Sequence, residues 1–125
     1  MYLRMSLVFL VAFLSACGGG GGSSPTPNPV PNPAPDPTMT EFSLVSAING
    51  VLNSDVSFSL QENNEFTGRV VTNTPVNALV ANFEFTGTSV SIGDVVQESG
   101  TTENDFTNKL TYTVTNEDGD IQDYV

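Results

Sequence analysis

Apolar and polar residues alternate along most of residues 40–125, with the period of a β-strand that buries one face. The clearest run places on one face Leu79, Ala81, Phe83 and Phe85. A second run sets Leu110, Tyr112 and Val114 against three alternating threonines. Weaker runs cover 41–45, 55–60, 66–72, 89–92 with 95–96, and a last segment that starts near Ile121. The pattern predicts about seven short strands.

Turn-forming residues separate these runs. They are Asn49-Gly50, Glu62-Asn63-Asn64, Gly93-Asp94, Ser99-Gly100 and Asp118-Gly119. Short strands spaced in this way, with no run of good helix formers between them, favour an all-β fold and specifically a β-sandwich. Because Asp-Gly readily adopts positive φ angles, Asp118-Gly119 predicts a type I′ hairpin between the last two strands.

Residues 1–16 have the layout of an export signal peptide. Arg4 supplies a positive charge, residues 7–14 are apolar, and the small residues Ser15 and Ala16 precede Cys17. The apolar part is too short to span a bilayer, which requires about 20 apolar residues. A plain secretory signal followed by an unrelated cysteine is the alternative to a lipoprotein signal.

Cys17 ends the run Leu14-Ser15-Ala16-Cys17, which resembles the lipobox of bacterial lipoproteins. The resemblance implies that the Cys17 thiol receives a diacylglycerol, that residues 1–16 are removed, and that the new N-terminus is acylated, with palmitate as the expected chain. Two or more acyl chains hold a protein stably at a membrane, where one does not. Gly18 replaces the aspartate that retains some lipoproteins at the inner membrane, and this favours the outer membrane of a bacterial cell envelope.

Residues 17–39 are predicted to form a disordered linker. Glycine and serine dominate up to Ser24, and proline then occupies every second position from Pro25 to Pro37. Alternating prolines favour polyproline II, so this half of the linker can extend about 40 Å. We expect a stalk that holds a domain at 40–125 away from the membrane. A ligand for a proline-recognising module is the alternative.

Charge and residue types exclude several function classes. After removal of residues 1–16, two basic residues, Arg69 and Lys109, remain against 14 acidic ones, which gives a formal net charge of −12. Such a surface repels phosphate backbones, so nucleic acid is not expected as a partner. The chain has no histidine and no tryptophan, and Cys17 is its one cysteine. Ser-His-Asp and Cys-His catalysis, histidine- or thiolate-bound metals and disulfides are therefore excluded.

The C-terminal third carries a motif of four segments. They are Asn104-Asp105-Phe106-Thr107, Leu110-Thr111-Tyr112-Thr113-Val114-Thr115, Glu117-Asp118-Gly119 and Gln122-Asp123-Tyr124-Val125. The motif resembles an Ig-like, DUF5018-like repeat of bacterial surface lipoproteins, and the resemblance extends over most of residues 40–125. It implies an Ig-like β-sandwich, often arranged in tandem ahead of other extracellular domains. Many such domains have no assigned activity.

The final strand departs from that repeat. In the repeat the strand continues with inward valines, whereas this sequence stops at Val125. We therefore expect a truncated last strand, which leaves unpaired backbone groups on its neighbour. Either the domain tolerates a frayed edge, or the chain is the N-terminal piece of a longer protein.

Acidic residues near the C-terminus form the one candidate metal site. Asp118, Asp120 and Asp123 are weak calcium candidates, because calcium is bound by clustered oxygen ligands. Their spacing does not match an EF-hand loop, which has acids at alternate positions before the glycine and a glutamate six residues after it. A solvated hairpin turn is the simpler interpretation.

Two further groups of residues are candidates for a binding or catalytic site. Glu98, Glu103 and Asp105 could bring two carboxylates together as in glycoside hydrolases, but solvated loops explain them more simply. The aromatic side chains are typical of a core and of cross-strand pairs. Without tryptophan, stacking on a sugar would depend on Tyr112 or Tyr124, and the repeat uses both positions structurally.

The sequence thus predicts a non-enzymatic, membrane-anchored lipoprotein without a cofactor. Its Ig-like domain is expected to act as a spacer or as an adhesion-type interaction module. The expected partners are the membrane, through the lipid anchor, and a surface polysaccharide or a protein. Two alternatives stay open, a carbohydrate-binding module and the N-terminal fragment of a larger surface enzyme.

Overall fold

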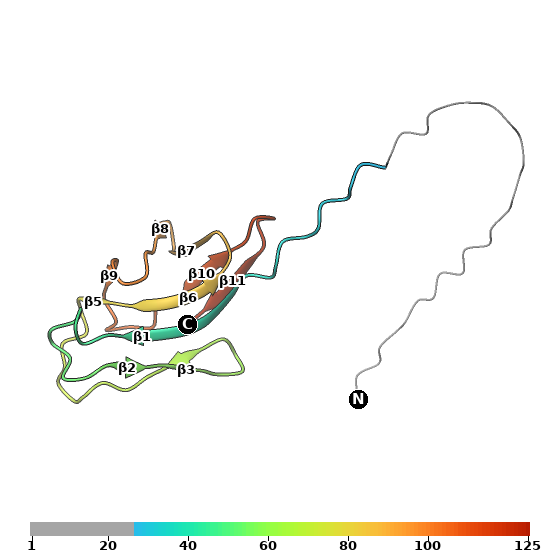
Figure 1. The fold of residues 1–125 in the computed structure, drawn as a ribbon. Coiled ribbons are helices and arrows are strands. Elements are labelled where there is room, and N and C mark those ends of the chain that lie inside the picture. The colour runs from blue at the N-terminus through green and yellow to red at the C-terminus, as the bar shows by residue number, and fades with distance from the viewer. Residues whose placement is uncertain (1–26) are drawn as a thin grey trace, which may run out of the picture. The chain divides into compact units, whose positions relative to one another are not determined.

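The structure is a computed structural model that describes residues 27–125, and every regular element in that range is a β-strand (Figure 1). The strands are β1 (Thr38–Leu44), β2 (Val56–Ser57), β3 (Ser59–Leu60), β4 (Phe66–Thr67), β5 (Leu79–Val80), β6 (Asn82–Thr86), β7 (Ser89–Ile92), β8 (Val95–Val96), β9 (Glu103–Asn104), β10 (Tyr112–Thr115) and β11 (Ile121–Tyr124). Between residues 27 and 125 there is no helix long and apolar enough to cross a membrane. Residues 1–26, which include the predicted signal peptide and Cys17, lie outside the described range.

Two larger antiparallel sheets form the layers of residues 31–125, and two two-stranded sheets, β3-β4 and β5-β9, accompany them. One of the larger sheets has the strand order β2-β1-β6, and the other has the order β11-β10-β7-β8. Figure 1 shows β1 and β6 side by side, with β7 and β10 in the second layer. The sheets meet through Phe42 of β1 and Tyr112 of β10, whose ring centroids are 5.2 Å apart. The predicted all-β sandwich is confirmed.

The core consists of eleven buried apolar side chains drawn from both larger sheets, from the loop after β1, and from β5 and the residue that follows it. They are Met39, Phe42, Leu44, Leu52, Leu79, Ala81, Phe83, Val90, Tyr112, Val114 and Tyr124. The predicted inward face of residues 79–85 is correct for its first three members, whereas Phe85 is 38 % exposed. Phe85 lies near the end of β6 and contacts one aromatic ring, that of Phe83.

A β-bulge in β1 explains how two residues three positions apart both face the core. The pairing of β1 with β6 shifts register between Met39 and Glu41. A strand with strict two-residue alternation would place Met39 and Phe42 on opposite faces. The extra residue of the bulge shifts the alternation of side chains by one position, so that Met39 and Phe42 point to the same face. Both are buried, while Thr40 and Glu41 are exposed.

Two of the predicted strands are each divided in the structure. The segment at 79–85 breaks at Ala81, because β5 pairs with β9 and β6 pairs with β1. Ala81 lies between them, and its carbonyl accepts a hydrogen bond of 2.8 Å from the N–H of Gly100. The segment at 55–60 breaks in the same way at Phe58, between β2 on β1 and β3 on β4. Each break marks a change of partner, and β9 was not predicted.

The last two strands form the predicted hairpin, but its turn differs from the predicted type. Strand β10 pairs with β11 from Tyr112↔Tyr124 to Thr115↔Ile121. The N–H of Asn116 donates to the carbonyl of Asp120 at 3.0 Å, and the N–H of Gly119 donates to the carbonyl of Asn116 at 3.2 Å. Gly119 has a φ of 86°, and Asp118 is not among the residues with positive φ. A type I turn followed by a glycine bulge fits these observations, and a type I′ turn does not.

The start of the sandwich also lies earlier than predicted. Thr38 and Met39 belong to β1 and not to the predicted linker, and Met39 is 1 % exposed. Pro37 is buried just before them. The ordered domain therefore includes the last residues of the proline-rich segment.

Candidate functional site

The end of the proline-rich segment is held by the turn between β10 and β11. The N–H of Ala34 donates to Oδ2 of Asp118 at 2.7 Å. Nδ2 of Asn116 donates to the carbonyl of Pro35 at 3.1 Å, and its Oδ1 accepts from the N–H of Asp120 at 2.8 Å. Asn116 is buried, so its side chain is a fixed part of the turn. We call this arrangement of residues 34–35 on residues 116–120 the linker contact.

The three calcium candidates have separate partners in the structure. Asp118 accepts from Ala34, Asp120 is 3.3 Å from the Asn116 amide, and Asp123 accepts from the hydroxyl of Thr113 at 2.6 Å. Within residues 27–125 no group of three His, Cys, Asp or Glu side chains is arranged to hold a metal ion. The acidic turn instead receives the linker, a contact that the sequence reasoning missed.

The second acidic group orders loops. Oδ1 of Asp105 accepts from the N–H of Thr107 at 2.8 Å, and hydrogen bonding to the Thr107 side chain and backbone lowers the pKa of Asp105. A general acid requires the opposite shift. The N–H of Glu98 donates to the Thr102 hydroxyl at 2.8 Å, and Glu103 is an exposed residue of β9. These contacts are those of ordered turns.

The aromatic side chains gather inside the sandwich. Tyr112 and Tyr124 are 4 % and 5 % exposed, so neither presents a ring to solvent for a sugar to stack on. Burial raises the pKa of Tyr112 to about 12, against the smaller opposing effect of its hydrogen bond with Asn104. Among the aromatic residues of the described range, Phe85 is the most exposed, at 38 %. A flat aromatic platform is therefore not formed by residues 27–125.

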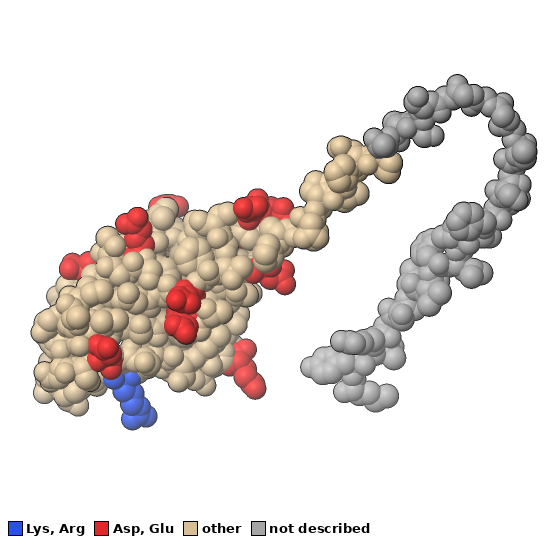
Figure 2. Space-filling model, viewed as in Figure 1, with Lys and Arg blue, Asp and Glu red and all other residues tan. Residues whose placement is uncertain are grey.

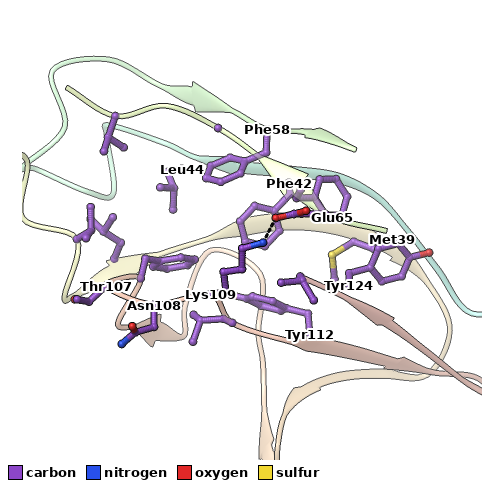
Figure 3. A pocket seen from close by; sticks show the side chains of 18 residues that line it. Met39, Phe42, Leu44, Phe58, Glu65, Thr107, Asn108, Lys109, Tyr112 and Tyr124 are labelled. Atoms are coloured by element: carbon purple, nitrogen blue, oxygen red, sulfur yellow. Dashed lines mark hydrogen bonds and ion pairs between the residues drawn. The ribbon is translucent and has the colours of Figure 1, made fainter. Parts of the chain in front are cut away.

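An apolar cavity of about 350 Å³ lies at one edge of the sandwich (Figure 3). Its apolar lining comprises Met39, Phe42, Leu44, Phe58, Phe66, Val70, Val76, Leu79, Phe106, Leu110, Tyr112, Tyr124 and Val125. Lys109 forms an ion pair with Glu65 on the polar side of the lining, and its hydrogen bond is the main reason that the pKa of Glu65 is lowered. Alternation along the chain gives no sign of this cavity, because it forms where β4 and the loop at 106–110 approach each other.

Acidic side chains far outnumber basic ones within residues 27–125. Figure 2 shows several of them scattered over the visible face, together with one basic side chain. Within residues 27–125 the basic residues are Arg69 and Lys109. The surface of residues 27–125 is therefore electronegative overall.

Fold and site together define a class of protein, a small all-β sandwich module that a proline-rich linker enters at a fixed point. A family model described as "SGBP, N-terminal" matches residues 39–125, and the chain belongs to this family. The family comprises cell-surface proteins associated with glycan binding, which agrees with the predicted bacterial envelope location. Searches of curated proteins and of solved structures gave no match.

Proposed function

We propose that the chain is a lipoprotein acylated at Cys17, whose sandwich is a non-enzymatic spacer between the membrane and the glycan-binding parts of a surface protein. The linker contact carries this proposal. It fixes residues 34–35 on the turn at 116–120, so the chain enters β1 from a defined position. A spacer has to hold its domain in a defined orientation relative to the stalk. A flexible joint between the linker and β1 would remove that orientation.

Family membership associates the protein with glycans, and the buried aromatics argue that this domain is not the binding surface itself. Sugar recognition by stacking needs exposed aromatic faces, and Tyr112 and Tyr124 are both in the core. We propose that the glycan-binding or catalytic parts belong to further domains of a larger surface protein, anchored at the outer membrane. The resemblance to DUF5018-like repeats supports this proposal, because such repeats are often arranged in tandem ahead of other extracellular domains.

The lipid anchor is tested at Cys17. Replacement of Cys17 by serine removes the only thiol of the chain, so incorporation of radiolabelled palmitate is expected to fall to background. The protein is expected to move from the membrane to the soluble fraction, because no acyl chain remains to hold it. The matched variant Ser15→Ala keeps a small residue beside the cut and is expected to retain the label. Palmitate labelling that persists in Cys17→Ser contradicts the proposal, and sedimentation with the inner membrane contradicts the outer-membrane part.

The spacer role is tested by electrophoresis of the full chain in native gels containing soluble starch or hydroxyethylcellulose. We expect unchanged mobility relative to gels without polysaccharide, because the described domain has no aromatic platform. Phe85 is the aromatic ring best exposed in the described range. Retardation that disappears in Phe85→Ala would identify a carbohydrate-binding module and contradict the spacer role.

A further inference from the structure

The loop between β1 and β2 contains Asn49-Gly50, the only Asn-Gly step in the sequence. Asparagine is a chemically labile residue, and in such a step it can lose its side-chain amide without an enzyme. The Gly50 nitrogen attacks Cγ of Asn49 and closes a succinimide ring. The Cγ–Nδ2 bond breaks, and the amide leaves as ammonia with the proton of the Gly50 N–H. Water then hydrolyses one of the two ring C–N bonds, which yields aspartate or isoaspartate.

The folded domain holds the Asn49 side chain in a fixed position, where it is 5 % exposed. Its Nδ2 donates to the carbonyl of Val80 at 2.8 Å and to the carbonyl of Val45 at 3.0 Å. Its Oδ1 accepts from the N–H of Val80 at 2.7 Å. The side chain thus pairs with both backbone groups of Val80 in β5, as a neighbouring strand would. Figure 1 shows the loop after β1 beside β5.

These three hydrogen bonds oppose the reaction at Gly50. Attack requires the Asn49 side chain to rotate until its Cγ lies against the Gly50 nitrogen, and that rotation breaks the bonds to Val45 and Val80. A buried amide that loses its partners is costly. The loop at 45–52 therefore has to open from β5 before the ring can close, and the rate is reduced by the small population of the open state.

The fold itself does not require a glycine at position 50. Gly50 is exposed, an added Cβ atom there meets nothing within 4 Å, and it is not among the glycines with positive φ. Alanine therefore fits this position without strain. Because glycine favours the attack through its conformational freedom and its missing Cβ atom, this replacement changes the chemistry of the step and leaves the fold intact.

The products of the reaction cannot restore the contact with β5. A carboxylate has no N–H group, so the carbonyls of Val45 and Val80 lose their donor and face a buried negative charge. Isoaspartate in addition inserts a methylene group into the main chain before Gly50. Either product is therefore expected to leave the loop at 45–52 detached from β5.

We propose that Asn49-Gly50 is a spontaneous deamidation site that the folded domain protects and that unfolding opens, with water as the only co-reactant. A chain that deamidates there while unfolded does not refold to the same structure. The site thus converts unfolding into a permanent change, and it limits how long an unfolded chain can still recover. This inference does not depend on the lipid anchor or on the spacer role.

The test incubates the full chain in mildly alkaline buffer below its Tm, with and without a denaturing concentration of urea. Cleavage after glutamate releases residues 42–62 as one peptide, whose mass and fragmentation report the conversion of Asn49. We expect conversion to be at least about 100-fold slower without urea, because the loop must open first. After dilution from urea, the refolded fraction measured by circular dichroism is expected to fall in step with the converted fraction.

Two variants separate the chemistry of the step from its structural consequence. Gly50→Ala is expected to change the Tm by less than about 2 °C, because the added Cβ atom has free space. Its conversion in urea is expected to be about 10-fold slower, and its refolding to be retained for longer. Asn49→Asp reproduces one product directly and is expected to lower the Tm by at least about 10 °C.

Three results overturn the proposal. Equal conversion with and without urea would show that the fold gives Asn49 no protection. Conversion in urea that Gly50→Ala leaves unchanged would exclude the succinimide route. A deamidated chain that refolds with an unchanged Tm would show that the contact with β5 is not needed. Conversion that is fast only in urea, slowed by Gly50→Ala and matched by the loss of refolding supports the proposal.

Discussion

Replacement of Phe42 by alanine is expected to lower the free energy of unfolding by about 3–5 kcal/mol. The ring is 6 % exposed, and its centroid lies 5.1 to 6.4 Å from five other aromatic rings. It contacts Phe83 on the neighbouring strand and Tyr112 in the opposite sheet, so its removal opens a void between the layers. For a domain of this size, whose total stability is on the order of 5–15 kcal/mol, the Tm should fall by roughly 20 °C.

Phe85→Ala is the matched control for this experiment, since it removes the same ring from β6. Phe85 is 38 % exposed and contacts one aromatic ring, that of Phe83 at 6.1 Å. Its replacement should cost less than that of Phe42, about 1–2 kcal/mol, because 38 % of Phe85 stays in water in the folded state and it has one aromatic neighbour. Urea denaturation of the two variants measures the difference. Equal losses would contradict the central position of Phe42 in the core.

Replacement of Gly87 by alanine should cost about 2–5 kcal/mol of unfolding free energy. Gly87 joins β6 to β7 with a φ of 152°, and a Cβ atom there would lie 2.5 Å from the carbonyl oxygen of Thr115. That oxygen belongs to the backbone and also accepts the N–H of Thr88 at 2.7 Å. Thr115 is held in β10 by pairing with both Ser89 and Ile121, so it cannot move aside.

Gly93→Ala separates the steric contact from the effect of a positive φ. Gly93 has a φ of 57°, and an added Cβ atom there meets nothing within 4 Å. Its replacement should cost about 1 kcal/mol, the strain of a left-handed residue alone. Both variants are compared by urea denaturation against the native chain. A loss for Gly87→Ala no larger than that for Gly93→Ala would show that the Thr115 backbone yields.

Local signals were sufficient to predict part of the fold. The β10–β11 hairpin follows from alternation on both sides of Asp118-Gly119, and its strands are close in sequence. The buried face of Tyr112 and Val114 follows from the same alternation. The breaks at Ala81 and Phe58 were not predicted, because a strand that changes partner keeps its apolar-polar pattern. Partner choice is set by contacts between distant segments.

The candidate site was less predictable for the same reason. Ala34 and Asp118 are 84 positions apart, and neither residue carries a pattern that identifies the other. Density of acids along the sequence suggested calcium at Asp118, Asp120 and Asp123, but the fold gives each carboxylate a different neighbour. The cavity likewise depends on how the 106–110 loop meets β4, which the sequence does not encode locally.

The linker contact has a mechanical consequence. The turn at 116–120, where residues 34–35 are held, lies at one end of β11, and Val125 lies at the other. A pull between the linker and Val125 therefore acts along the strands. Antiparallel ladder bonds are perpendicular to their strands, so such a load shears the whole ladder at once instead of opening it pair by pair. The domain is connected so that tension is shared among many hydrogen bonds.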